Sequence, residues 1–268
     1  MIFEYFGGLL SPIIATFIWS LIVGIASFLL VFKTSLFDNL IEHPLVPPFL
    51  CLPAIMFAFL MGFMSADAWQ NFTQARAALI NESSAISRLV FVPMKTPEEQ
   101  KGHNANLQAY LEAVLFEEWE KSFNKTPSLK AKEALNGLSA AIWKGSTACI
   151  NSSRKRDECI DAFTSTSLIK AHDDLRNARE QRLSIGYIES ANVKWILSIL
   201  LALIATISVA AVQKGNQKSG VIAIVLFCSG VWISFCIVTM YSNPYKWAER
   251  LEPIPLSLLL DDLKAIQK

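Results

Sequence analysis

Four stretches of the chain contain no Asp, Glu, Lys or Arg and consist mainly of apolar residues. They are residues 5–32, 44–66, 195–213 and 219–245. A helix crosses the hydrocarbon core of a bilayer with about 20 apolar residues, since each residue advances it by about 1.5 Å. The pattern therefore predicts four membrane-spanning helices.

Residues 67–194, between the second and third stretches, have the opposite character and hold most of the charged side chains. Their apolar residues recur three and four positions apart, which is typical of helices, and show no sustained alternation typical of strands. The sequence thus predicts an all-α membrane protein with four transmembrane helices and a helical soluble domain inserted between the second and third.

This organisation divides the chain into four parts. Residues 1–66 carry the first two transmembrane helices, and residues 67–194 form the helical soluble domain. Residues 195–245 carry the last two transmembrane helices, and residues 246–268 form a C-terminal tail with a short amphipathic helix. The first apolar stretch lacks the basic leader of a signal peptide, so we expect it to be retained as a span.

Two features predict where helices of the domain begin and continue. No Gly or Pro interrupts residues 67–91, so the second membrane helix is expected to continue into the domain. Thr96, Pro97 and Glu99 form a capping box with proline at the first helical position, which predicts that a new helix starts there.

The composition agrees with a membrane protein that has a soluble part. Hydrophobic residues make up 53% of the 268 residues and charged residues 18%, compared with about 25% charged residues in soluble domains. The mean hydropathy is +0.37. Basic and acidic residues nearly cancel, with a formal net charge of +1, which argues against a nucleic-acid partner.

Enzyme chemistry finds no support in the motifs. The three histidines, His43, His103 and His172, stand far apart, and no glycine-rich phosphate loop or nucleophile motif is present. We predict no catalytic activity, no cofactor and no metal site.

Cys149 and Cys159 are the cysteines outside the predicted spans, and whether they pair depends on the compartment and stays open.

The second apolar stretch carries two columns of residues at four-residue spacing, which stack on one face of a helix. One column is bulky and consists of Ile55, Phe59 and Phe63. These side chains can face lipid, fill the core of a helix bundle or line a narrow axis between several helices. The second column is a small-xxx-small ridge that favours close helix packing; it consists of Ala54, Ala58, Gly62 and Ala66.

The charged residues of the domain allow two interpretations each. A glutamate cluster beside Trp119 is expected to form the solvated side of a helix, with attraction of ions as the alternative; it comprises Glu117, Glu118 and Glu120. Three arginines are expected to pair with Glu82 on the helix that continues the second span, with lining of an anion vestibule as the alternative; they are Arg176, Arg179 and Arg182.

The motif "IMFAFLMGF", which begins at Ile55, resembles the Ile-x-x-x-Phe-x-x-Gly-Phe pattern of the second membrane helix in the bestrophins. The segment "SNPYKW", with Asn243 and Pro244, is similar to the Asn-Pro-Phe-Gly that follows the fourth span in that family, and "IPLSLLLDDL" follows it from Ile254. In more detail, "WQNFTQARAALINESSAI", "YLEAVLFEEW" and "AREQRL" resemble segments of the bacterial bestrophin-like membrane proteins.

The resemblance implies a homopentamer with a central ion pathway and a hydrophobic neck lined by Ile55, Phe59 and Phe63 of every subunit. An apolar ring of this kind can gate by wetting and dewetting, and the positive edges of aromatic rings can face an anion. The chain departs from the animal members, which bind calcium through an acidic run after the Asn-Pro-Phe segment. Here Lys246 follows Tyr245 and no acidic run stands at this place, so the sequence does not predict a calcium site of the animal type.

Asp67 lies four positions beyond Phe63 and has two open interpretations. Copies of Asp67 around an axis would place a negative ring at a pore mouth and favour cations. Alternatively, Asp67 is an ordinary interfacial aspartate close to Trp69, since tryptophan commonly marks the headgroup level.

The function expected from these observations is an oligomeric, bestrophin-like ion channel in contact with membrane lipid. It is expected to be a multi-pass protein of a bacterial inner membrane that passes small inorganic ions, with anions such as chloride expected. Basic residues near the span ends favour a cytoplasmic soluble domain. The alternative is a membrane-anchored helical interaction or scaffold module without conductance. The permeant ion, the gating stimulus and the partners of the domain stay open.

Overall fold

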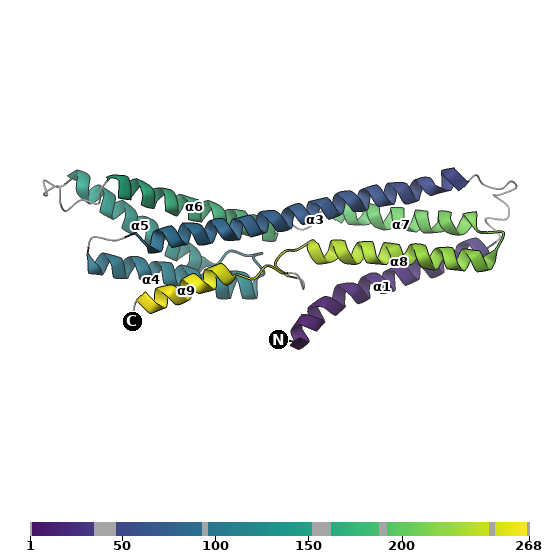
Figure 1. Ribbon diagram of the computed structural model, residues 1–268, viewed down its shortest axis with the longest axis horizontal. Helices are drawn as coiled ribbons and strands as arrows, with labels where there is room; N and C mark the ends of the chain where they lie inside the picture. The colour runs from purple at the N-terminus through teal and green to yellow at the C-terminus, as the bar shows by residue number, and fades with distance from the viewer. Residues whose placement is uncertain are drawn as a thin grey trace. The chain divides into compact units, whose positions relative to one another are not determined.

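The structure, a computed structural model, describes residues 2–34, 47–92, 96–151, 162–187, 192–246 and 250–266. Over these ranges the chain is helical and contains no strand. The helices are α1 (Ile2–Phe32), α3 (Pro47–Val90), α4 (Pro97–Ala113), the π-helix η1 (Val114–Lys121), α5 (Leu129–Asn151), α6 (Ala162–Tyr187), α7 (Asn192–Val212), α8 (Gln217–Tyr241) and α9 (Ile254–Ile266) (Figure 1). The predicted all-α class is confirmed.

Four of the helices in the described ranges are long and apolar enough to cross a membrane. The helical segments that contain an apolar stretch of sufficient length are Ile13–Phe32, Cys51–Val90, Val193–Val212 and Gln217–Tyr241. They belong to α1, α3, α7 and α8, which confirms the four apolar helices expected from the charge-free stretches.

The predicted start and continuation of helices in the polar part of the chain are also confirmed. Helix α3 runs without interruption to Val90, because no residue after Pro53 breaks it. Thr96 is the N-cap of α4, and its hydroxyl accepts a hydrogen bond of 3.2 Å from the Glu99 backbone N–H. Pro97 occupies the first turn, where its missing N–H costs no hydrogen bond.

The chain folds as two compact units. The first unit comprises Met1–Phe72 with Glu189–Arg250, and the second comprises Thr73–Ile188 with Leu251–Lys268. In the first unit α1, α7 and α8 contact one another (Figure 1). One core cluster of this unit joins α3 to α7 and α8 and consists of Phe57, Met61, Met64, Ala202, Val231, Phe235 and Val238.

Aromatic contacts and one indole hydrogen bond fix the packing in the first unit. The Trp19 and Phe235 rings meet edge to face, with 5.3 Å between their centroids, and Trp195 stacks on Phe235 at 5.9 Å. The Trp232 indole N–H of α8 donates to the Ile13 carbonyl of α1 over 3.3 Å. Buried aromatic pairs of this geometry add to the packing energy beyond their area.

The second unit is a helical bundle in which α5 contacts α4 and α6, and α9 contacts α4 (Figure 1). Its centre contains fully buried leucines from several helices, namely Leu107, Leu111, Leu138, Leu175, Leu256 and Leu263. The α9 residue Lys264 forms a 3.2 Å ion pair with Glu112 of α4. The indole N–H of Trp119 donates to the Leu251 carbonyl over 3.2 Å, so the C-terminal segment is part of this unit.

Gly186 allows α6 to approach the backbone of the loop after η1. A Cβ at Gly186 would lie 2.2 Å from the Asn124 carbonyl oxygen, a distance that backbone atoms cannot tolerate. We expect Gly186→Ala to destabilise the second unit by about 1–3 kcal/mol, because the loop or the helix must shift. Gly102 of α4 is a matched control, since a Cβ there meets nothing within 4 Å.

Gly102→Ala should stabilise the protein by about 0.5–1 kcal/mol, because alanine restricts the unfolded chain more than glycine does. Thermal unfolding of both variants in detergent, followed by circular dichroism, measures the difference. Equal melting temperatures for the two variants would contradict the close approach at Gly186.

Candidate functional site

The bulky column of α3 points away from the core of the first unit. The side chains of Ile55, Phe59 and Phe63 are 49%, 66% and 69% exposed. In contrast, Phe57 is only 6% exposed, and its ring packs 5.9 Å from that of Phe235. The helix period explains the division, because residues four apart share a face and Phe57 lies half a turn from Phe59. The column is therefore available to another molecule.

The small-residue ridge of α3 lies beside this column and is also open. Gly62 is exposed, and a Cβ built on it meets no heavy atom within 4 Å. Ala58 and Ala66 are exposed, and Ala54 is half-buried. The ridge thus makes no close packing contact at Gly62 within the described chain, and its flat surface is available to a helix of another subunit.

Asp67 forms an ion pair within the first unit. Its carboxylate accepts a hydrogen bond from the Lys194 ammonium group, and the two side chains are 52% and 54% exposed. Close by along α3, the rings of Trp69 and Phe72 stack with 6.2 Å between centroids, and Tyr241 lies 6.1 Å from Phe72. Tryptophan and tyrosine gathered beside a charged pair are typical of a membrane interface.

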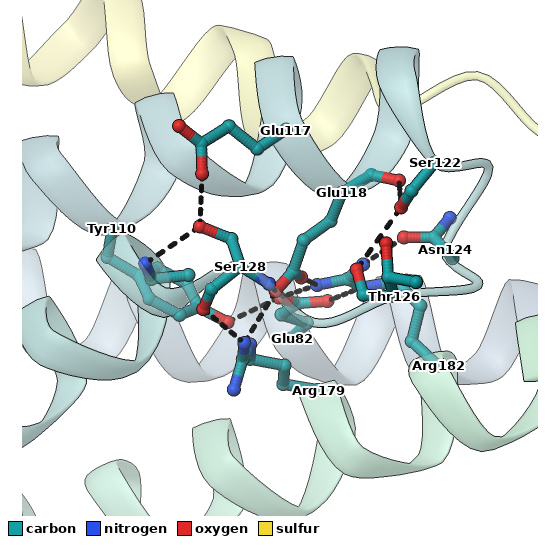
Figure 2. Close-up of polar contacts among 11 residues, drawn as sticks. Glu82, Tyr110, Glu117, Glu118, Ser122, Asn124, Thr126, Ser128, Arg179 and Arg182 are labelled. Carbon is teal, nitrogen blue, oxygen red and sulfur yellow. Dashed lines mark hydrogen bonds and ion pairs between the residues drawn. The ribbon is translucent and has the colours of Figure 1, made fainter.

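A buried network of charged residues occupies the second unit (Figure 2). The Arg182 guanidinium binds Glu82 through two N–H groups, with Nε–Oε2 and Nη2–Oε1 distances of 2.6 and 3.1 Å. It also donates to Glu118 Oε2 over 2.8 Å. These three side chains have no exposed surface. The arrangement joins α3, η1 and α6 through charge-assisted hydrogen bonds.

Two further side chains, Arg179 and Tyr110, join the network. Arg179 donates to Glu118, so two guanidinium groups face two carboxylates and the formal charges cancel. The Tyr110 hydroxyl donates to Glu82 Oε1 over 2.6 Å. Burial, together with the charge of Glu82, raises the pKa of Tyr110 well above its ordinary value, so the phenol keeps its proton and remains a donor.

The π-helix η1 and the loop after it hold Glu118 and Asn124 in place. The Asn124 backbone N–H donates to the Glu118 carbonyl over 2.7 Å, while its side-chain oxygen accepts from Arg182. Phe123 and Asn124 have positive φ angles of 50° and 58°, a conformation that asparagine tolerates better than most residues. The Ser128 N–H donates to Glu118 Oε1 over 2.8 Å.

The structure confirms one prediction for the charged residues and shows that another is wrong. The expected pairing with Glu82 is confirmed for Arg182, whereas Arg179 pairs with Glu118 and Arg176 pairs with Glu180. Glu118, however, is fully buried and does not belong to the solvated side of its helix. Glu118 follows Val114 by four residues and Leu111 by seven, so it lies on the apolar stripe of the helix. This spacing is visible in the sequence and is the signal for its burial.

The formal charges of the network cancel, with two guanidinium groups facing two carboxylates. The Arg182 guanidinium lies over the Trp119 ring, with 5.3 Å from Cζ to the ring centroid, so an indole covers one of its faces. Among the described residues, no three His, Cys, Asp or Glu side chains are placed to hold a metal ion. The network therefore positions helices, and the outward face of α3 is the candidate functional site.

Comparison with known proteins gives a family and a fold. The sequence model of the bestrophin-like domain matches residues 17–256. The chain is also similar to solved variants of a bacterial bestrophin homologue from Klebsiella pneumoniae. One has a TM-score of 0.68 at 12% identity and covers 93% of this chain and 98% of its own. Another has a TM-score of 0.63 at 14% identity, with coverage of 97% and 98%. No curated protein gives a significant match.

Proposed function

The chain belongs to the bestrophin-like family, and on this basis we propose that it is an oligomeric ion channel. The neck would be formed by Ile55, Phe59 and Phe63 from every subunit, arranged as a homopentamer. One observation carries this proposal: three large apolar side chains at successive helical turns are exposed on the same face of α3, whereas Phe57 is buried.

The apolar neck would control the passage of small ions by dewetting. Water leaves a narrow ring of hydrophobic side chains, and the loss of water raises the barrier for an ion. Phenylalanine edges carry the positive part of the ring quadrupole and favour an anion over a cation at close range. Chloride is therefore the permeant ion that we propose.

The flat ridge of α3 supports close packing between neighbouring subunits. Ala58, Gly62 and Ala66 leave room for another helix at short distance, since small residues let helix backbones approach in a membrane. A ring closed by such contacts would place the bulky column of each α3 toward the axis.

Asp67 would lie at the mouth of this pathway, where the neighbouring Lys194 ammonium group weakens the negative electrostatic potential of its carboxylate. Lys194 pairs with it in the same subunit, so a ring of Asp67 residues would be accompanied by a ring of equal positive charge. The pair favours the interpretation of Asp67 as an interfacial residue and weakens the case for a cation-selecting ring.

The soluble domain, residues 67–194, is proposed to be inserted between the second and third transmembrane helices and to lie in the cytoplasm of a bacterium, with the channel in the inner membrane. The span ends on the domain side carry several basic residues, which include Arg176, Arg179 and Lys194. Basic residues near span ends are more frequent on the cytoplasmic side.

Purified protein reconstituted in liposomes tests the function directly. We expect chloride efflux from chloride-loaded vesicles that contain the protein and none above background from protein-free vesicles. Subunit counting in detergent should give a closed ring of five. A monomer or dimer without ion flux would instead support the alternative of a membrane-anchored interaction module, in which the aromatic residues of α3 only pack.

A further inference from the structure

A polar groove with a volume of about 320 Å³ lies between α3 and α6 in the second unit. Charged, amide and hydroxyl side chains line it almost entirely, and only Ala178 is apolar. The polar residues are Asn81, Ser84 and Arg88 of α3, with Asp174, Asn177 and Gln181 of α6. Such a lining is suited to water and hydrated ions and gives little apolar surface for a protein partner.

One ion pair joins the two walls of the groove. Arg88 Nη2 lies 2.7 Å from Asp174 Oδ2, and the two side chains are 46% and 39% exposed. Both groups therefore remain in contact with solvent while they neutralise each other. An exposed pair of this kind contributes at most about 1 kcal/mol to stability, so removal of either charge leaves the protein folded.

The helical period relates the groove to the proposed neck. An α-helix completes five turns in 18 residues, so positions 18 apart fall on the same face. Asn81 follows Phe63 by this interval, and Ser84 follows Ala66. Because α3 is one continuous helix, its period predicts that the face bearing the neck residues carries uncharged polar groups further along, next to Arg88.

We propose that this groove lines the aqueous vestibule of the ion pathway and that the Arg88–Asp174 pair keeps the vestibule electrically neutral, so that the vestibule favours neither anions nor cations. The proposal rests on the channel function. In a ring of subunits, Arg88 and Asp174 supply equal numbers of positive and negative charges, and their pairing cancels the field of each ring. The selectivity for anions or cations is then determined by the neck, because a neutral vestibule attracts neither sign of charge.

Removal of one charge should bias the vestibule toward the opposite sign. Arg88→Gln leaves a ring of unpaired Asp174 carboxylates, which attracts cations, and Asp174→Asn leaves a ring of unpaired Arg88 groups, which attracts anions. We expect the chloride-to-potassium permeability ratio to fall in the first variant and to rise in the second, by roughly two- to tenfold each. This size corresponds to a surface potential of about one kT, which is modest for a ring of like charges.

Reversal potentials in planar bilayers under a potassium chloride gradient measure these ratios. The double variant Arg88→Gln with Asp174→Asn should return to the wild-type permeability ratio, because it removes both charges of the pair and leaves the groove neutral. Arg176→Gln is the matched control. Arg176 belongs to an exposed pair with Glu180 on the same helix, about 200° around α6 from Asp174, and its loss should leave the ratio unchanged.

The outcomes separate this inference from the channel function. Shifts of opposite sign for the two single variants, without a shift for Arg176→Gln, support the vestibule. A conducting wild type with no shift in either single variant, with shifts of the same sign or with an equal shift in Arg176→Gln, overturns the inference and leaves the channel function intact. A wild type that does not conduct overturns the channel function, and the vestibule fails with it.

Discussion

Replacement of Ile55 and Phe59 together by alanine is expected to raise the single-channel conductance of the reconstituted protein about fivefold. The two side chains are 49% and 66% exposed on the outward face of α3. Their truncation would widen the neck and admit water, which lowers the barrier for an ion. A reduction of the barrier by about 1 kcal/mol corresponds to that increase in rate. Planar bilayer recordings at symmetric chloride concentration measure it.

Phe57→Leu is the control for this experiment. The Phe57 side chain is 6% exposed and lies in the core of the first unit, where its ring contacts those of Phe227 and Phe235. A change from one large apolar residue to another at a core position is tolerated in most cases and should leave conductance close to that of the wild type. An equal rise in conductance for Phe57→Leu would show that the column on α3 has no special role.

The membrane helices and the long helix α3 could be predicted from sequence because the determinants are local. Charge-free stretches define the spans, and the absence of Gly and Pro predicts that the helix continues to Val90. The cap at Thr96 is likewise a matter of four consecutive residues. Hydrophobic periodicity and capping act within one or two turns, so a single sequence contains the information.

The burial of Glu118 could not be predicted from local sequence as the helices were, because it depends on residues far along the chain. Its partners Arg179 and Arg182 lie 61 and 64 residues away. Spacing placed Glu118 on the apolar stripe, but a carboxylate is buried only when a cation neutralises it, and periodicity does not identify the cation. For the same reason, the helical period of one chain does not identify what Phe59 and Phe63 face in the proposed ring of subunits.

We expect replacement of Arg182 to reduce the free energy of unfolding more than the replacement of Gly186 or Arg176 does. Arg182→Met should destabilise the second unit by about 3–5 kcal/mol, because among the described residues it leaves two buried carboxylates, those of Glu82 and Glu118, beside one guanidinium group, that of Arg179. Arg176→Met is the matched control on the same helix. Arg176 is 64% exposed and pairs with Glu180 one turn away, so its loss should change stability by about 0.5 kcal/mol or less.

Thermal unfolding followed by tryptophan fluorescence compares the two variants, and similar melting temperatures would contradict a buried network. A second substitution distinguishes an unpaired charge from a lost contact. Glu82→Gln added to Arg182→Met removes one uncompensated carboxylate while it keeps the size of the side chain, so part of the lost stability should return. If the double variant is less stable than Arg182→Met alone, the cost comes from lost hydrogen bonds and packing around Tyr110 rather than from the stranded charge.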